Sequence, residues 1–285
     1  MPSRRRLLRL GSAAIVGLAG CSGRRGTAPT ASDSPTPTAT PPRTGGPTPT
    51  ARERAFGETG PDGITPVGTA VQSAVRHLQS TDHNGIMVGD HWYLFVTVEP
   101  DGGGPEATDF RLRTPSDIYE PFAVESDWRR QQIAYVNGDA YEPNRSGWLL
   151  FTVPYDERPE RAWLTLDRTE WSLPASALDR LRAEPPAFDL RGVEPPESPP
   201  HDEPFDVTLR VDNDGSAGTF RAAFNYTAPL YYPQGVVSAI EGGATRDVSV
   251  TVDIHTSGTG NEPGDAVAAN VVSAGGGAEW SVTLS

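Results

Sequence analysis

Hydrophobic and polar residues alternate with a period of two through much of the chain after residue 64, and this alternation predicts β-strands. In residues 91–98, Trp92, Leu94, Val96 and Val98 fall on one face, and the other face is also largely apolar. A strand that is apolar on both faces belongs inside a packed structure, so we expect it to be central. Residues 147–154 and 161–166 show a similar pattern and predict two more strands.

A second series of strands follows after residue 204. Phe205, Val207, Leu209 and Val211 alternate with polar residues, which predicts a strand with one buried face. Later strands are expected at 218–224, 246–254, 266–274 and 280–284. Residues 174–183 are the best helix candidate, since Pro suits a first turn and a Pro pair follows at 185–186. The pattern predicts an all-β protein with two β-sandwich domains joined by a short linker helix.

The first 63 residues lack this alternation. Residues 1–20 have a cationic start and then a short apolar run, which would span only about 16 Å as a helix and so predicts a signal peptide rather than a membrane span. Residues 27–50 are rich in Pro and Thr and contain no large apolar side chain. Such a composition cannot form a core and favours extended polyproline II, so residues 21–63 are predicted to be a disordered stalk.

Two short motifs at the N-terminus suggest export from the cytoplasm and attachment to the membrane. Arg4 and Arg5 lie in a segment that resembles the twin-arginine export signal, and the weak hydrophobicity of the following run suits that route. Residues 18–21, Leu-Ala-Gly-Cys, resemble the lipobox of lipoproteins, and Cys21 is the one cysteine of the chain. The resemblance implies a lipid on Cys21 and a place on the outer face of the cell membrane, in the extracellular space. The alternative is a free Cys21 that is discarded with a signal peptide cleaved elsewhere.

Two further motifs carry resemblances to known folds. Residues 147–154 fit the Gly-x-Leu-x-Phe-x-Val-Pro pattern of telokin-like immunoglobulin domains, a resemblance that covers residues 64–173. Val211, Asn213 and Gly215 fit the Val-x-Asn-x-Gly step of CARDB-like immunoglobulin modules, which places the second domain at 185–285. The linker helix is then expected at 174–184. These resemblances imply immunoglobulin-like sandwiches and no shared activity.

The charge of the chain is strongly acidic. The sequence has 37 Asp and Glu against 24 basic residues, all of them Arg, and residues 61–285 hold 34 acids and 15 Arg, a balance of −19. This sign argues against nucleic acid as a partner, because phosphate polymers require a basic surface. The absence of Lys together with many short carboxylates resembles haloarchaeal proteins, and it predicts a protein adapted to high salt.

Candidate modification sites are present in both predicted domains. Asn144 and Asn225 begin Asn-x-Ser and Asn-x-Thr triplets, which are acceptor patterns for N-glycosylation. The Thr, Ser and Pro residues of the stalk resemble O-glycosylated stalks. An exported destination would expose the chain to the modifying enzymes, so a glycoprotein is expected.

Candidate catalytic chemistry is sparse. His77, His83 and His91 lie within fifteen residues, and Asp82 and Asp90 flank two of them, which makes them weak candidates for a metal site. The alternative is that they are polar residues of turns and strand ends. No nucleophile motif is found, so no catalytic residue, metal or other cofactor is predicted.

These patterns predict a cell-surface lipoprotein with a binding or structural role. Its expected partners are the membrane, through the lipid, and another cell-surface protein or glycan. The alternative is an exported enzyme or metal-binding protein whose site lies on loops between strands, since loops of a sandwich can carry a site without a linear motif.

Overall fold

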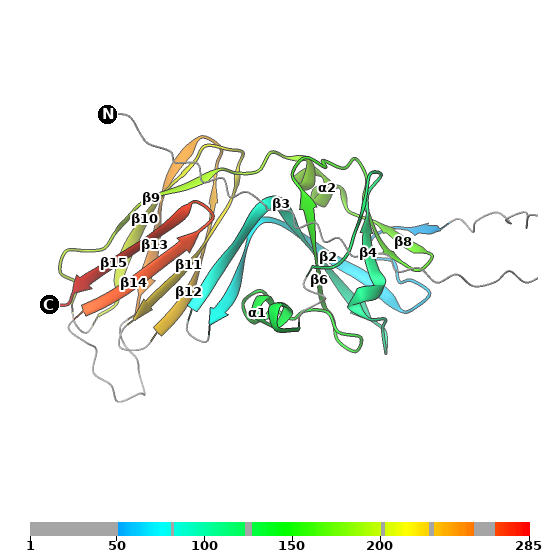
Figure 1. Ribbon diagram of the computed structural model, residues 1–285, viewed down its shortest axis with the longest axis horizontal. Coiled ribbons are helices and arrows are strands. Elements are labelled where there is room, and N and C mark those ends of the chain that lie inside the picture. Colours follow the sequence, from blue (N-terminus) through cyan, green and yellow to red (C-terminus); the bar gives the residue numbers. More distant parts are fainter. Residues whose placement is uncertain (1–50, 81–82, 123–126, 201–202, 228–230, 254–265) are drawn as a thin grey trace, which may run out of the picture. The chain divides into compact units, whose positions relative to one another are not determined.

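The computed structural model describes residues 51–80, 83–122, 127–200, 203–227, 231–253 and 266–285 (Figure 1). These residues belong to one compact unit, and most of them lie in β-strands, as the alternation predicted. The signal peptide, the export arginines Arg4 and Arg5, the lipid-attachment candidate Cys21 and the stalk up to residue 50 lie outside the described residues. None of the described helices is both long and apolar enough to cross a membrane.

The strands of the first part of the chain are β1 (Arg52–Arg54), β2 (Ile64–Ser80), β3 (His83–Pro100), β4 (Phe110–Arg113), β5 (Ile118–Tyr119), β6 (Gly147–Pro154), β7 (Trp163–Leu166) and β8 (Thr169–Ser172). Those of the second part are β9 (Phe188–Glu194), β10 (Phe205–Asn213), β11 (Gly218–Thr227), β12 (Tyr231–Ile240), β13 (Ala244–Val252), β14 (Ala266–Ser273) and β15 (Gly276–Thr283). The helices are α1 (Asp127–Asn137), α2 (Ala175–Arg182) and a 3₁₀ turn at Ala107–Asp109.

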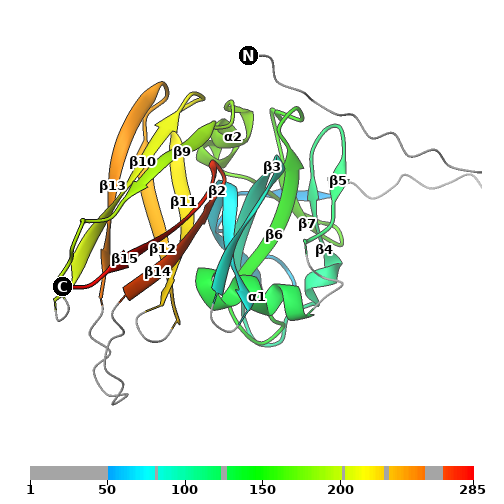
Figure 2. The ribbon, with the colours of Figure 1, turned by 60° about the vertical axis from the view of Figure 1, so that its left-hand side comes forward.

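The first part of the chain forms two sheets with a shared core. One sheet has the order β1-β8-β7-β4-β5 and the other β2-β3-β6. Trp92 and Leu94 of β3 belong to the same buried cluster as Phe110 and Leu164 of the five-stranded sheet. The opposite face of β3 is also covered, because Phe95 packs in a second cluster that includes Ile133 of α1 (Figure 2). The central position predicted for residues 91–98 is therefore confirmed.

The second part of the chain also forms two sheets around one core. Their strand orders are β13-β10-β9 and β12-β11-β14-β15. Strand β10 alternates strictly between buried and more exposed positions, and Val207 and Leu209 pack in one cluster with Phe220 and Val271 of the four-stranded sheet. The one-sided burial expected for residues 205–211 is confirmed. The helix expected at 174–184 is also present as α2.

Three differences from the expectations stand out. Residues 51–63, assigned to the disordered stalk, are instead folded: β1 pairs in parallel with β8, and Trp171 Nε1 donates a 2.8 Å hydrogen bond to the carbonyl of Glu58. Helix α1 was not expected, nor was the edge strand β12, which contains Pro233 and Gly235. In each case a contact with the sheets orders a segment that has little apolar periodicity of its own.

Candidate functional site

The two parts of the chain meet where the far end of the β2–β3 hairpin packs on the four-stranded sheet. The main-chain N–H of Asn84 donates to Asn225 Oδ1 at 2.9 Å, and Asn225 Nδ2 donates back to the carbonyl of Asn84 at 3.0 Å. Both asparagines are buried, with 3% of their surface exposed. This pair of hydrogen bonds fixes the hairpin to β11.

The same contact bears on the two glycosylation candidates. Asn144 lies exposed in a turn before β6, where a sugar could be attached to its side chain. Asn225 uses its Nδ2 in the buried bond to Asn84, and a glycan on this nitrogen is not compatible with that contact. In the folded protein only Asn144 of these two offers an accessible acceptor.

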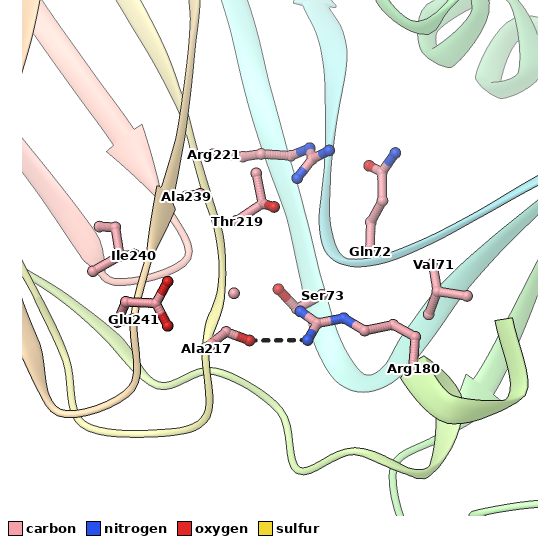
Figure 3. A pocket seen from close by; sticks show the side chains of 11 residues that line it. Val71, Gln72, Ser73, Arg180, Ala217, Thr219, Arg221, Ala239, Ile240 and Glu241 are labelled. Carbon is pink, nitrogen blue, oxygen red and sulfur yellow. Dashed lines mark hydrogen bonds between the residues drawn. The ribbon is translucent and has the colours of Figure 1, made fainter. Parts of the chain in front are cut away.

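Beside this junction lies a cavity of about 270 Å³, which we call the arginine cleft. One wall comes from β2 and α2, and the other from β11 and the residues next to it on β12 (Figure 3). The lining residues are Val71, Gln72, Ser73, Arg180, Ala217, Gly218, Thr219, Arg221, Ala239, Ile240 and Glu241.

Arg180 lies at one side of the arginine cleft, where a hydrogen bond and a ring contact position its guanidinium. It lies on α2, and its Nη1 donates a 2.9 Å hydrogen bond to the carbonyl of Ala217 across the cavity. Its guanidinium also lies over the Trp92 ring, 4.9 Å from the ring centroid. Burial lowers the pKa of Arg180 from its ordinary value, against a smaller opposing effect of Tyr155. The side chain therefore presents a fixed, partly desolvated positive charge.

Arg221 extends from β11 toward the β2 side of the cleft (Figure 3). It is half-buried, and it has neither a hydrogen-bond nor an ion-pair partner among the described residues. Burial lowers its pKa, and repulsion by Arg180 and Arg76 lowers it further. A buried charge normally has a partner of opposite sign. Arg221 is therefore a cation in this cleft that lacks a counterion among the described residues.

Arg76 adds a third positive charge near the cleft. Its Nη2 donates to the carbonyl of Val136 at 3.2 Å, and its guanidinium occupies the space above Gly235, where an added Cβ would lie 1.2 Å from Nη1. Burial lowers the pKa of Arg76 as well. Within the described part of the chain, none of Arg76, Arg180 and Arg221 forms an ion pair with a carboxylate.

Neutral polar groups complete the lining. Ser73 and Thr219 bring hydroxyl groups from the two walls, and Gln72 extends from β2 (Figure 3). The Oε1 atom of Gln72 is buried and has no hydrogen-bond partner in the described structure. Glu241 is the one carboxylate among the lining residues, and it is exposed. The lining thus combines cations that form no ion pair among the described residues with neutral hydroxyl groups.

The three histidines are spread along the β2–β3 hairpin. His77 lies on β2 opposite Gly85, His83 begins β3, and His91 stacks edge-on to Tyr93 with ring centroids 4.6 Å apart. Burial lowers the pKa of His91, against a smaller opposing effect of Asp90. Among the described residues no three metal-binding side chains come together, so the hairpin does not gather these histidines into a ligand set.

The arginine cleft was not predicted from the sequence. Arg76, Arg180 and Arg221 come from β2, α2 and β11 and are separated by up to 145 positions, so no linear motif joins them. An Arg in an alternating strand is ordinary on a solvent face. The one available signal was Arg221 itself, next to Phe220 and Ala222 in a strand that is buried along most of its length.

Comparison with known proteins gives no family for this chain. No family model matches it, and no curated protein matches it either. Two solved structures show a distant likeness. A DUF4785 family protein of Legionella pneumophila is 12% identical with a TM-score of 0.23, over 69% of this chain and 51% of that one. The dimeric latent PorU of Porphyromonas gingivalis is 14% identical with a TM-score of 0.20, over 77% of this chain and 20% of that one. TM-scores this low support no inference from these two proteins about the fold or the activity of this chain.

Proposed function

We propose that this protein is a lipid-anchored binding protein of the cell surface, and that the arginine cleft is its binding site for a small anion. The observation that carries this proposal is Arg221, a half-buried cation without a counterion in a chain whose formal net charge is −13. Thirty-seven acidic residues are available, and none among the described residues pairs with it. A bound anion would supply the missing charge.

The proposal includes the setting that the sequence predicts. A lipid on Cys21 would hold the protein on the outer face of the membrane of a salt-adapted archaeon, and the stalk would carry the folded part outward. The folded part would consist of a telokin-like and a CARDB-like immunoglobulin sandwich. Its partner would be another cell-surface protein or a glycan that carries the anionic group.

The size of the cleft limits the ligand. A volume of about 270 Å³ is at the lower end for small-molecule sites, so it suits a small anion or the anionic end of a larger molecule. Specificity would come from the fixed guanidinium of Arg180, because a planar guanidinium binds a carboxylate with two parallel hydrogen bonds.

Calorimetric titration of the full-length protein with acetate, phosphate and sulfate tests the proposal. Arg221→Gln should weaken binding at least tenfold, because a charge-assisted hydrogen bond contributes about 1.5–3 kcal/mol. The matched control is Arg210→Gln, which removes an exposed Arg of β10 and should leave binding unchanged. Absence of binding by all three anions, or equal loss in both variants, would refute the anion site.

A further inference from the structure

The most exposed large apolar side chain among the described residues lies beside the arginine cleft. Val237 of β12 has 64% of its surface exposed, and it is the cross-strand partner of Arg221 on β11. Cross-strand partners project from the same face of a sheet, with their Cβ atoms about 5 Å apart. Val237 therefore lies next to the cation that lacks a counterion among the described residues.

The apolar surface continues from Val237 into the cleft. Thr219 pairs with Ala239 in the same ladder, so Ala239 follows Val237 on this face, about 6.5 Å further along β12. Ala239 lines the cavity, and Val71 adds an apolar side chain from the β2 wall (Figure 3). A strip formed by Val237 and Ala239 thus runs beside the polar groups of Arg221 and Thr219. We call it the apolar strip.

A second cation lies at the other end of the apolar strip. Gly235 precedes Val237 by two residues and projects from the same face. The guanidinium of Arg76 occupies the space above Gly235, where an added Cβ would lie 1.2 Å from Nη1. The apolar strip is therefore short, because it begins in the cleft and ends at a charged group.

We infer that the ligand is a carboxylate with a short aliphatic tail, the chemistry shared by free aliphatic acids and by peptides that end in an aliphatic residue. This inference rests on the proposed function. The carboxylate would bind Arg221 and Arg180, and the tail would cover Ala239 and Val237. Contact with the tail would remove apolar surface of the strip from water, which is favourable. The guanidinium of Arg76 would limit the length of the tail.

The lining favours a single carboxylate as the charged group. A carboxylate matches the planar fork of a guanidinium. Glu241 lines the same cavity, and its carboxylate would repel a second negative charge on the ligand. Inorganic sulfate and phosphate could neutralise the arginines, but they have no apolar group to cover Val237.

A series of acids of increasing length tests the tail. Acetate, butyrate and hexanoate carry the same charge and differ only in their number of CH₂ groups. Calorimetric titration of the full-length protein at a fixed KCl concentration should show affinity rising about twofold with each CH₂, roughly fifteenfold from acetate to hexanoate, because the tail is partly buried. The alcohol 1-hexanol has the tail without the charge and should bind at least tenfold more weakly than hexanoate.

A variant of Val237 tests where the tail lies. Val237→Thr keeps the branched shape and replaces one methyl group with a hydroxyl. The hexanoate-to-acetate ratio of affinities should fall from roughly fifteenfold to about fivefold. The matched control is Ile118→Thr, which changes a residue of β5 that is 59% exposed and should leave the ratio as it is. An unchanged ratio in Val237→Thr, or an equal fall in both variants, would overturn the assignment of the tail to the apolar strip.

The outcomes separate this inference from the proposed function. Equal binding of acetate and hexanoate by the native protein would overturn the inference, and this comparison requires no variant that has to fold. The anion site would still stand in that case if Arg221→Gln weakened the binding of acetate. Binding of 1-hexanol as tight as that of hexanoate would contradict the role of the arginines, and so would refute both proposals.

Two further ligands distinguish the sources of the carboxylate. N-acetylleucine and 4-methylpentanoate share the carboxylate and the branched tail, and only N-acetylleucine adds the amide of a peptide chain. Tighter binding of N-acetylleucine would identify the C-terminus of a peptide as the ligand, and tighter binding of 4-methylpentanoate would identify a free acid. Failure of both to bind more tightly than acetate would overturn the aliphatic tail.

Discussion

At the scale of single residues, Asn213 holds together the turn that leads from β10 toward the arginine cleft. It is fully buried, its Nδ2 donates to the carbonyls of Ser216 and Ile240, and its Oδ1 accepts from the main-chain N–H groups of Ala187 and Gly215. One side chain thus connects three separate stretches of main chain, at residues 187, 215–216 and 240. The Val-x-Asn-x-Gly resemblance marked this residue, but only the fold shows which groups it joins.

Replacing this side chain should therefore be costly. Asn213→Ala leaves several buried or partly buried main-chain groups without this partner, and we expect the free energy of unfolding to fall by about 2–4 kcal/mol. Urea unfolding in molar KCl measures it. Asn270→Ala is the matched control, because Asn270 is half-buried and its side chain forms no hydrogen bond among the described residues, and it should change stability by about 0.5 kcal/mol or less. Equal effects of the two variants would contradict the role assigned to Asn213.

At the scale of elements, β1 fastens the end of the stalk to the folded part. Glu53 Oε1 accepts hydrogen bonds from Ser172 Oγ at 2.5 Å and Trp163 Nε1 at 3.2 Å, while β1 pairs with the edge of β8. Both hydrogen bonds lower the pKa of Glu53, and the bond from Ser172 has the larger effect. They do so although Glu53 is exposed. A strand of three residues has few other contacts, so we expect its docking to depend on Glu53.

Limited proteolysis can measure this docking. Trypsin cuts after Arg, and Arg52 and Arg54 lie within β1. Glu53→Ala should speed cleavage at these two sites by on the order of tenfold, because a protease cuts the undocked strand. Glu58→Ala is the control, since only main-chain groups of Glu58 form hydrogen bonds among the described residues: its carbonyl accepts from Trp171 and its N–H donates to Ala55. Mass spectrometry identifies the cut; unchanged cleavage in Glu53→Ala would show that strand pairing alone holds β1.

The elements also show how far the sequence could predict this fold. Strands with strict alternation, such as β10, and the Pro-bounded helix α2 were predictable because their own residues carry the signal. Strand β12 contains Pro233 and Gly235, and its register comes from pairing with β11. The arginine cleft could not be predicted from the sequence either, because its walls come together only through the packing of elements that are distant in the chain.

At the scale of the whole molecule, the two parts have separate cores and a polar junction. Among the described residues, the buried clusters of residues 64–181 and of residues 205–284 share no member. The contact between the parts relies on the Asn84–Asn225 pair and on the region of the arginine cleft. A ligand in that cleft would touch both parts, so its binding should stabilise the junction between them as well as fill the site.

The acidic surface leads to a prediction about salt. With a balance of −19 over residues 61–285, carboxylates repel one another, and too few Arg residues exist to neutralise them. Raising KCl from about 0.1 M to about 1 M shortens the Debye length from about 10 Å to about 3 Å, which screens this repulsion. We expect the melting temperature to rise by on the order of 10 °C, measured by circular dichroism.

Charge variants separate this repulsion from other effects of salt. Glu160, Glu194 and Glu203 are exposed and form no ion pair among the described residues, so replacing all three with Gln should raise the melting temperature at low salt and flatten its rise with KCl.

Chloride can also occupy the arginine cleft and stabilise the protein by binding, so the series is repeated in Arg221→Gln, which removes that contribution. A melting temperature that stays level with KCl in the native protein would show that the acids serve solubility alone. A rise that is lost only in Arg221→Gln would instead place the salt effect in the cleft, because screening of the surface acts equally in both backgrounds.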